Sequence, residues 1–279
     1  MLTIKDILTS ATAQLSSVSD SAKLDSELLL SFLLNKPRTY LHTWPDVTLN
    51  DEAFNKFNRL LERRMHGEPI AHIVGKRGFW SLNLKVTADT LIPRPDTERL
   101  VELALEIIPQ PAQWNILDLG TGTGAIALSL AKERQACFIT AIDQSTKALE
   151  VAKQNAANNQ INNIEFIQSD WFEKLENRYF DMIVSNPPYI CDNDPHLKIG
   201  DVRFEPLSAL TAGADGLNDI RTIINNSHHY LNKNGVLLIE HGFDQADVVC
   251  DLLKTANFIK VRNFKDYGGN PRVSIGHIK

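Results

Sequence analysis

Residues 115–133 read NILDLGTGTGAIALSLAKE, and this stretch sets the architecture of most of the chain. A short apolar run comes first, three glycines at alternate positions follow, and the remainder has the apolar spacing of a helix. Glycines let a backbone turn sharply and approach a ligand closely, and the N-terminus of the next helix offers free amide donors. We therefore expect a strand, a ligand-binding turn from Gly120 to Gly124, and a helix.

Four more apolar runs, separated by helical patterns, follow toward the C-terminus. They are CFITAID at 137–143, IEFIQSD at 164–170, DMIVSN at 181–186 and GVLLIE at 235–240, with helical patterns between them. Strands that alternate with helices predict an α/β fold, in which a parallel sheet carries helices on both faces. Because such sheets bind ligands at the carboxyl ends of their strands, we expect the chemistry just after each run.

Carboxylates and one indole stand at the ends of the second and third runs. Asp143 is placed to accept hydrogen bonds from two ribose hydroxyls, as in dinucleotide-binding folds. Asp170 can accept the amino group of an adenine, and the Trp171 ring can cover the face of that base. These residues predict a nucleoside cofactor. The glycine turn also fits the permissive nicotinamide fingerprint G-x-G-x-x-A, so an oxidoreductase stays open at this point.

The tetrapeptide Asn186-Pro187-Pro188-Tyr189 directly follows the fourth run and argues against hydride transfer. With proline at about 5% of residues, it should occur by chance in roughly one chain in a thousand of this length. A residue before proline is driven toward extended geometry, and each proline fixes its own φ angle. The Asn186 side chain and the Pro187 carbonyl are therefore expected to form two rigid hydrogen-bond acceptors.

Two rigid acceptors suit an NH₂ group whose lone pair is delocalised, as in an amide or an adenine. The amide rotation barrier of about 18–20 kcal/mol measures how strongly that lone pair is withheld. Hydrogen bonds from both N–H groups would favour a pyramidal nitrogen, and Tyr189 would stack on the amide and face a passing positive charge. In-line positioning supplies about 7–11 kcal/mol in well-oriented systems. A sulfonium methyl is already an activated electrophile, so its transfer requires no strong base.

The N-terminal part, from Thr3 to Gly67, has apolar residues at helical spacing, which predicts a small helical domain. They form three groups, namely Ile4, Ile7 and Leu8, then Leu24, Leu28, Leu29 and Phe32, then Phe54, Phe57, Leu60 and Leu61. Asn50 is expected to cap the third helix and Gly67 to end it in a left-handed turn. The charged residues of this helix are expected to face water, namely Arg59, Glu62, Arg63 and Arg64. Alternation at 77–86 predicts a β-hairpin next. It places Phe79, Ser81, Asn83 and Lys85 on the face opposite to Trp80, Leu82, Leu84 and Val86.

Together these motifs resemble class I S-adenosylmethionine-dependent methyltransferases. IPRPDTE at 92–98 narrows the resemblance to protein glutamine-N5 methyltransferases, and most closely to the family that modifies peptide chain release factors. The similarity covers essentially the whole chain and includes DVRFEPLSAL at 201–210 and EHG at 240–242. It implies a doubly wound, mostly parallel, seven-stranded Rossmann-like sheet. It also implies a helical substrate-recognition domain at 1–75, a hairpin linker at 76–90 and a methyltransferase domain at 91–279.

The resemblance further implies roles for single residues. S-adenosylmethionine, which becomes S-adenosylhomocysteine, would be bound by Gly120, Thr121, Gly122, Thr123, Gly124, Asp143, Asp170, Trp171 and Asn186. The glutamine of a Gly-Gly-Gln loop in a release factor would be held by Asn186, Pro187, Pro188 and Tyr189, of which Asn186, Pro187 and Tyr189 would be catalytic. The helical domain would recognise the release factor.

Composition limits the remaining possibilities. A formal net charge of −5 gives no basic excess for holding a nucleic-acid duplex, so no direct nucleic-acid partner is expected. No apolar run approaches the roughly 20 residues that span a bilayer, so no membrane partner is expected either. Three dispersed cysteines suggest neither disulfides nor a zinc site, and they favour a cytoplasmic location. His228, His229 and His241 lack metal spacing.

Three alternatives stay open. A DNA adenine-N6 methyltransferase needs the same two acceptors, but it should carry a basic target-recognition region and must flip its base. A ribosomal-protein glutamine methyltransferase would differ mainly in what its N-terminal domain recognises. A catalytically silent binding module would predict a damaged tetrapeptide. The segment from 191 to 214, beside the site, is expected to be a long loop that acts as a lid.

Overall fold

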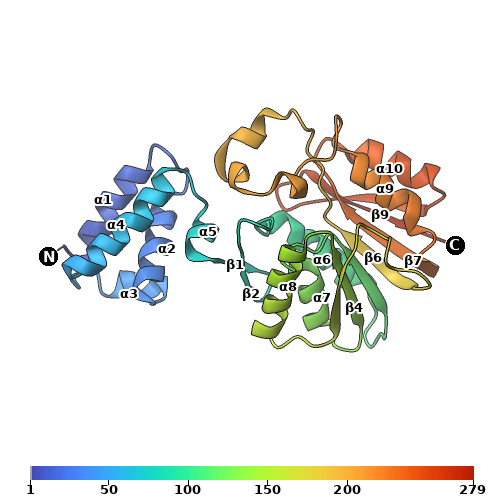
Figure 1. The fold of residues 1–279 in the computed structure, drawn as a ribbon, viewed down its shortest axis with the longest axis horizontal. Helices are drawn as coiled ribbons and strands as arrows, with labels where there is room; N and C mark the ends of the chain where they lie inside the picture. Colours follow the sequence, from blue (N-terminus) through green and yellow to red (C-terminus); the bar gives the residue numbers. More distant parts are fainter. Residues whose placement is uncertain (1) are drawn as a thin grey trace. The chain divides into compact units, whose positions relative to one another are not determined.

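The computed structural model describes residues 2–279, and the chain divides into two compact units. One unit contains the N-terminal residues through Lys76 together with residues 198–204. The other contains Arg77–Leu197 and Glu205–Lys279. Figure 1 draws the helices of the first unit in blue and cyan, and the sheet of the second unit from green to red. No helix in the described part of the chain is long and apolar enough to cross a bilayer.

The larger unit is built on a seven-stranded sheet with the strand order β5-β4-β3-β6-β7-β9-β8. Neighbouring strands from β5 to β7 are parallel, while β9 runs antiparallel to both β7 and β8. The predicted doubly wound, mostly parallel sheet is confirmed. The strands are β3 (Asn115–Leu119), β4 (Phe138–Asp143), β5 (Ile164–Gln168), β6 (Phe180–Ser185), β7 (Leu231–Glu240), β8 (Ile259–Lys265) and β9 (Pro271–His277).

Helices cover both faces of this sheet, because alternate residues of a strand point to opposite faces. In β3, Ile116 joins the apolar core under α6 and α7, whereas Leu117 and Leu119 join the core under α9 and α10. Figure 1 shows these layers on either side of the strands. The helices are α6 (Glu98–Ile107), α7 (Ala125–Glu133), α8 (Thr146–Asn158), α9 (Asn218–Ser227) and α10 (Ala246–Thr255). Strand order reverses between β3 and β6, where open α/β sheets bind ligands.

The smaller unit is helical, as predicted, and contains α1 (Ile4–Leu15), α2 (Ala22–Leu34), α3 (Arg38–Thr43), α4 (Asp51–Met65) and α5 (Ile70–Val74). The Asn50 side chain accepts the Ala53 N–H at 2.8 Å, and Gly67 follows α4 with a φ of +87°. Both expected helix ends are therefore confirmed. In α2, Leu29 and Leu30 are buried while Leu24 and Phe32 are exposed, so only part of the apolar group read from the sequence lies in the core.

Arg64 corrects a second expectation, because it does not face water. Its side chain is 8% exposed, Nε donates to Asp25 Oδ2 at 2.7 Å, and Nη1 donates to Asp201 Oδ1 at 3.0 Å. Both carboxylates lie far from Arg64 in the sequence, so a local charge pattern does not reveal them. The other charged residues of this helix, Arg59, Glu62 and Arg63, are exposed as expected.

The predicted hairpin is present as β1 (Lys76–Phe79) and β2 (Leu82–Lys85), which form a two-stranded sheet. Trp80 has a φ of +53° in the connection, which breaks the alternation at this point. Phe79 is consequently buried with Leu82 and Leu84 instead of on the opposite face. The Asn155 side chain bridges the backbone N–H and C=O of Lys85 at 2.7 and 3.0 Å, which fixes β2 against α8.

Candidate active site

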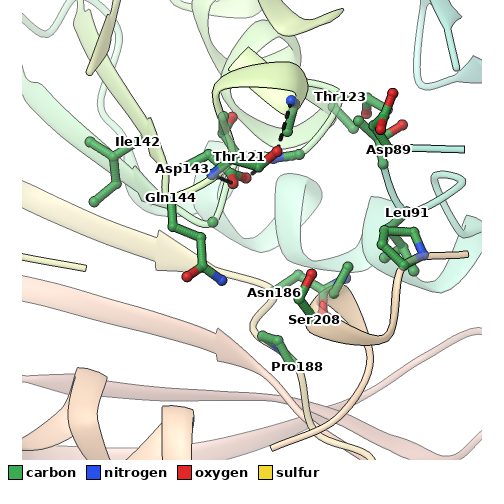
Figure 2. A pocket seen from close by; sticks show the side chains of 18 of the residues that line it. Asp89, Leu91, Thr121, Thr123, Ile142, Asp143, Gln144, Asn186, Pro188 and Ser208 are labelled. Carbon is green, nitrogen blue, oxygen red and sulfur yellow. Dashed lines mark hydrogen bonds between the residues drawn. The ribbon is translucent and has the colours of Figure 1, made fainter. Parts of the chain in front are cut away.

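A cavity of about 790 Å³ opens where β3, β4 and β6 end, entirely within the larger unit. This volume falls in the usual range of small-molecule sites, about 300–1,000 Å³. Figure 2 shows Asp143 and Gln144 to its left, Asp89 and Leu91 to its right, and Asn186 and Pro188 below. Its lining comes from 88–97, the glycine turn, the ends of β4 and β5, the tetrapeptide, residues 206–209 and α9. The strand ends that the sequence indicated are therefore brought together.

The glycine turn adopts a left-handed backbone at two positions where the structure requires it. Gly122 has a φ of +55°, and a Cβ there would meet nothing within 4 Å, so this side of the turn is open toward a ligand. Gly124 has a φ of +83°, and a Cβ there would lie 2.9 Å from Leu128 Cδ1. Gly122 thus exposes its backbone to the cavity, and the absence of a side chain at Gly124 lets α7 begin without a clash with Leu128.

Asp143 lies at the carboxyl end of β4 and faces the turn. Its Oδ2 accepts the Gly122 backbone N–H at 2.9 Å, and its Oδ1 accepts the Ser145 backbone N–H at 2.8 Å. Burial raises the pKa of this carboxyl, and the two backbone donors lower it. Each oxygen of an ionised carboxylate keeps a second acceptor position, so the group suits a pair of neighbouring hydroxyls.

Asp118, at the end of β3, supports the turn from below, and the sequence reasoning did not assign it a role. Its Oδ2 accepts from the Thr121 hydroxyl at 2.7 Å and from the Ala127 N–H at 3.2 Å. Its Oδ1 is buried and has no hydrogen-bond partner among residues 2–279. Burial raises the pKa of Asp118 to about 7, and the nearby Asp143 adds to that rise.

The other end of the cavity is formed by Asp170 and Trp171, which both line it as predicted. Trp171 has a φ of +40°, and its ring lies 3.6 Å from where a Cβ of Gly120 would stand. Asp219 and Thr222 of α9 also line this end, and the sequence reasoning missed both. A hydrogen bond from the Trp171 side chain lowers the pKa of Asp219, although burial, the larger effect, raises it. An acid in the first turn of a helix is too common to mark a site.

The tetrapeptide contributes two of its four residues to the cavity lining, Asn186 and Pro188. Pro187 is buried, and Tyr189 packs against the core with its backbone N–H bonded to Leu210 O at 3.2 Å. Burial raises the pKa of the Tyr189 hydroxyl well above its ordinary value. Asn186 Nδ2 donates to Thr97 Oγ1 at 3.1 Å, which leaves Oδ1 as the free acceptor of its amide. Stacking of Tyr189 on a substrate stays a prediction.

The segment from 191 to 214 is a connection with three short 3₁₀ turns, η2 (Pro195–Lys198), η3 (Gly200–Phe204) and η4 (Leu207–Ala209). Pro206, Ser208 and Ala209 line the cavity, and the buried Glu205 accepts a hydrogen bond from Arg94 at 2.7 Å. Residues 198–204 belong instead to the helical unit. Movement of this segment as a lid stays a prediction.

Two of the three histidines that lack metal spacing make structural contacts. His241 is buried, and its Nε2 lies 3.0 Å from Ser274 Oγ. His228 bonds to the Ala256 carbonyl. Within the part of the chain that the structure describes, no cluster of His, Cys, Asp and Glu could hold a metal ion. These histidines have structural contacts, as expected.

Comparison with known proteins finds two matching family models. The methyltransferase small domain matches residues 99–205, and the PrmC N-terminal domain matches residues 6–75. A protein of Vibrio cholerae is 50% identical over 100% of this chain and 98% of its own length. Proteins of Aliivibrio fischeri and Escherichia coli are 52% and 50% identical over 92% of this chain, and over 91% and 93% of their own lengths. All three are named release factor glutamine methyltransferase.

Solved structures show the same fold at low sequence identity. A methyltransferase from Pyrococcus furiosus matches with a TM-score of 0.55 and 18% identity, over 79% of this chain and 98% of that one. A 16S rRNA N2 G1207 methyltransferase of T. thermophilus, in complex with AdoMet and guanosine, matches with a TM-score of 0.53 and 19% identity, over 73% of this chain and 50% of that one. The sheet of the larger unit is therefore one that methyltransferases use.

Proposed function

The chain belongs to the family of release factor glutamine methyltransferases, and from that premise we propose that it methylates the side-chain amide nitrogen of a glutamine in a peptide chain release factor. The target is the glutamine of the Gly-Gly-Gln loop, and the methyl donor is S-adenosylmethionine. One observation carries the proposal. Asn186 lines the same cavity as the glycine turn and Asp143, so a nucleoside donor and an amide acceptor would meet there.

The cavity fits S-adenosylmethionine in size and in chemistry. The backbone at Gly122 is open, both Asp143 oxygens keep an acceptor position for the ribose, and Trp171 offers an aromatic face to the adenine. Asp170 lies beside Trp171 and serves as acceptor for the adenine amino group. When bound, the cofactor supplies a methyl group that the positive sulfonium already activates.

The tetrapeptide prepares the acceptor nitrogen. Asn186 Oδ1 and the Pro187 carbonyl accept the two N–H groups of the substrate amide, which aims its lone pair toward the cofactor end of the cavity. No His, Lys or Cys is found among the described residues that line the cavity. Positioning, rather than proton abstraction by a strong base, is therefore what these residues provide.

We assign recognition of the release factor to the helical unit, since the PrmC N-terminal domain model matches it at residues 6–75. Several large apolar side chains of this unit are exposed, among them Leu24, Phe32 and Trp44. Exposed apolar groups of this size are common anchors in protein interfaces. They support a protein rather than a nucleic acid as the partner.

The test is transfer of radiolabelled methyl from S-adenosylmethionine into a purified release factor. Parallel reactions contain the same factor with Gln→Ala in its Gly-Gly-Gln loop, a ribosomal protein, or duplex DNA, and an Asn186→Ala enzyme serves as the inactive control. Label that enters the release factor and disappears with the Gln→Ala change supports the proposal. Label that enters only the ribosomal protein or the DNA overturns the assigned substrate.

A further inference from the structure

Two motifs of the sequence have no role in the function described so far, IPRPDTE at 92–98 and EHG at 240–242. The fold brings them together behind the tetrapeptide. Ser185 of β6 pairs with Ile239 of β7, so Asn186 and Glu240 are the next residues on two adjacent parallel strands. Thr97 ends the 3₁₀ turn η1 (Pro95–Thr97) and lies beside Asn186.

Glu240 is a carboxyl group that is buried in the interior of the larger unit. It is 1% exposed, and its Oε2 atom has no hydrogen-bond partner within residues 2–279. The hydroxyls of Thr97 and Tyr189 approach it as hydrogen-bond donors and lower its pKa, although burial, the larger effect, raises that pKa to about 7. Glu240 therefore lies next to Asn186 across the strand pair and near the Tyr189 hydroxyl, at the two ends of the tetrapeptide.

The charged surroundings of Glu240 are few. Arg272 of β9 lowers its pKa and Asp96 of η1 raises it. Arg272 itself is held by Asp266 at 3.2 Å and by Asp96 at 3.6 Å. A buried charge is retained in proteins only when nearby groups compensate it. Two hydroxyls and one guanidinium offset part of this cost, but burial remains the larger effect on the pKa of Glu240.

This arrangement favours one orientation of the Asn186 amide. A side-chain amide has two orientations that exchange its donor NH₂ and its acceptor oxygen. When Glu240 is ionised it can only accept, so it accepts a hydrogen bond from the Thr97 hydroxyl, and Thr97 Oγ1 is left to accept from Asn186. The NH₂ of Asn186 then faces Thr97, and Oδ1 faces the cavity, where an acceptor is needed.

We propose that Thr97 and Glu240 are positioning residues that lock the Asn186 amide with its oxygen toward the substrate nitrogen. Thr97 lines the cavity beside Asn186, whereas Glu240 is buried and does not line it. The proposal rests on the methyl transfer proposed above, because only an N–H substrate requires an acceptor at Oδ1. The proposal gives the motifs at 92–98 and 240–242 one common role, which is to orient the Asn186 side chain. The two motifs are far apart in the sequence but adjacent to Asn186 in the fold.

The test compares Thr97→Val with Thr97→Ser. Valine keeps the shape of threonine and removes the hydroxyl, whereas serine keeps the hydroxyl and removes the methyl group. Thr97→Val is expected to lower kcat at least tenfold, with the Kd for S-adenosylmethionine within twofold of wild type. Thr97→Ser is expected to keep kcat within threefold. Glu240→Gln, whose amide can also donate to Thr97, should lower kcat to an intermediate value.

A second readout does not depend on activity. Hydrogen exchange of the Asn186 side-chain NH₂, assigned by NMR with the help of Asn186→Ala, should be slow in wild type and in Thr97→Ser and at least tenfold faster in Thr97→Val. Equal exchange in all three proteins overturns the proposed lock, even if the wild type proves inactive on release factors. Faster exchange in Thr97→Val with an unchanged kcat overturns the positioning role. An inactive wild type with the expected exchange pattern overturns only the proposed function.

Discussion

Asp143 Oδ2 accepts the backbone N–H of Gly122 at 2.9 Å, which joins the end of β4 to the turn that follows β3. With Oδ1 held by Ser145 at 2.8 Å, the carboxylate cannot rotate freely. Its two remaining acceptor positions are therefore fixed before any ligand arrives. Such preorganisation reduces the entropy that binding has to overcome.

Replacing Asp143 should weaken cofactor binding more than it slows transfer. Hydrogen bonds to a charged group contribute about 1.5–3 kcal/mol, so Asp143→Ala is expected to raise the Kd for S-adenosylmethionine roughly ten- to hundredfold. Isothermal titration calorimetry measures the change. Asp251→Asn, on the exposed face of α10, is the matched charge-removing control and should bind as the wild type does. An unaltered Kd in Asp143→Ala would remove Asp143 from the site.

Replacing Asn186 should slow methyl transfer more than it weakens cofactor binding. Asn186→Ala removes an acceptor that matters most in the transition state, so kcat should fall about a hundredfold or more while the Kd for S-adenosylmethionine changes little. Single-turnover methyl transfer at saturating cofactor separates the two effects. Turnover near the wild-type rate would contradict the role given to the tetrapeptide.

Gly124 should be intolerant of a side chain for a steric reason. Its φ of +83° and the 2.9 Å approach of Leu128 to a Cβ predict that Gly124→Ala lowers the free energy of unfolding by about 1–3 kcal/mol. Gly78→Ala is the control, because a Cβ there meets nothing within 4 Å. Urea denaturation of both variants gives the comparison. Equal losses in the two would show that the close approach to Leu128 is not the cause.

Asp118 predicts a pH-dependent stability. Its pKa is about 7 in the folded protein and 3.8 as the ordinary value, so unfolding releases a proton between these pH values, and stability falls as pH rises through that window. Asp118→Asn lacks this titration. Its free energy of unfolding relative to wild type should therefore increase from pH 4.5 to 7.5, by at most about 4 kcal/mol. Parallel pH profiles for the two proteins would show that Asp118 does not titrate in this way.

The helical unit should govern the affinity for the release factor. Phe32→Ala and Trp44→Ala remove exposed apolar groups, so each is expected to raise the KM for the release factor several-fold. The Kd for S-adenosylmethionine should stay unchanged, and circular dichroism checks that the variants fold. Lys56→Ala, on exposed α4, controls for a general surface effect. A KM that neither aromatic variant alters would place the recognition surface elsewhere.

Structural features that depend on residues close together in the sequence could be predicted from it. The strand, the glycine turn and the helix are adjacent in the chain, so the pattern at 115–133 predicts all three. The ends of α4 were equally readable, because Asn50 and Gly67 act on their immediate neighbours. Asp143 and Asn186 were placed correctly in the cavity because parallel strands end at one edge.

Contacts between distant segments were not readable in the same way. Asp219 lines the cavity at the start of α9, where it lies near Trp171, and its helical surroundings in the sequence give no hint of this. Thr97 and Glu240 belong to recognisable motifs, but their meeting behind Asn186 depends on strand order. Phe79 changed faces because the turn at Trp80 interrupts an alternation that the sequence appears to continue.

The bond between Arg64 and Asp201 bears on how this protein could be recombined with its relatives. Residues 198–204 belong to the helical unit although they are encoded within the methyltransferase region, so that unit is discontinuous in the gene. A single crossover near residue 76 would transfer Asp25 and Arg64 from one parent and Asp201 from the other. Chimeras should therefore keep these two ion pairs only when both parents have the same residues at positions 25, 64 and 201. Otherwise a second exchange has to transfer residues 198–204 as well.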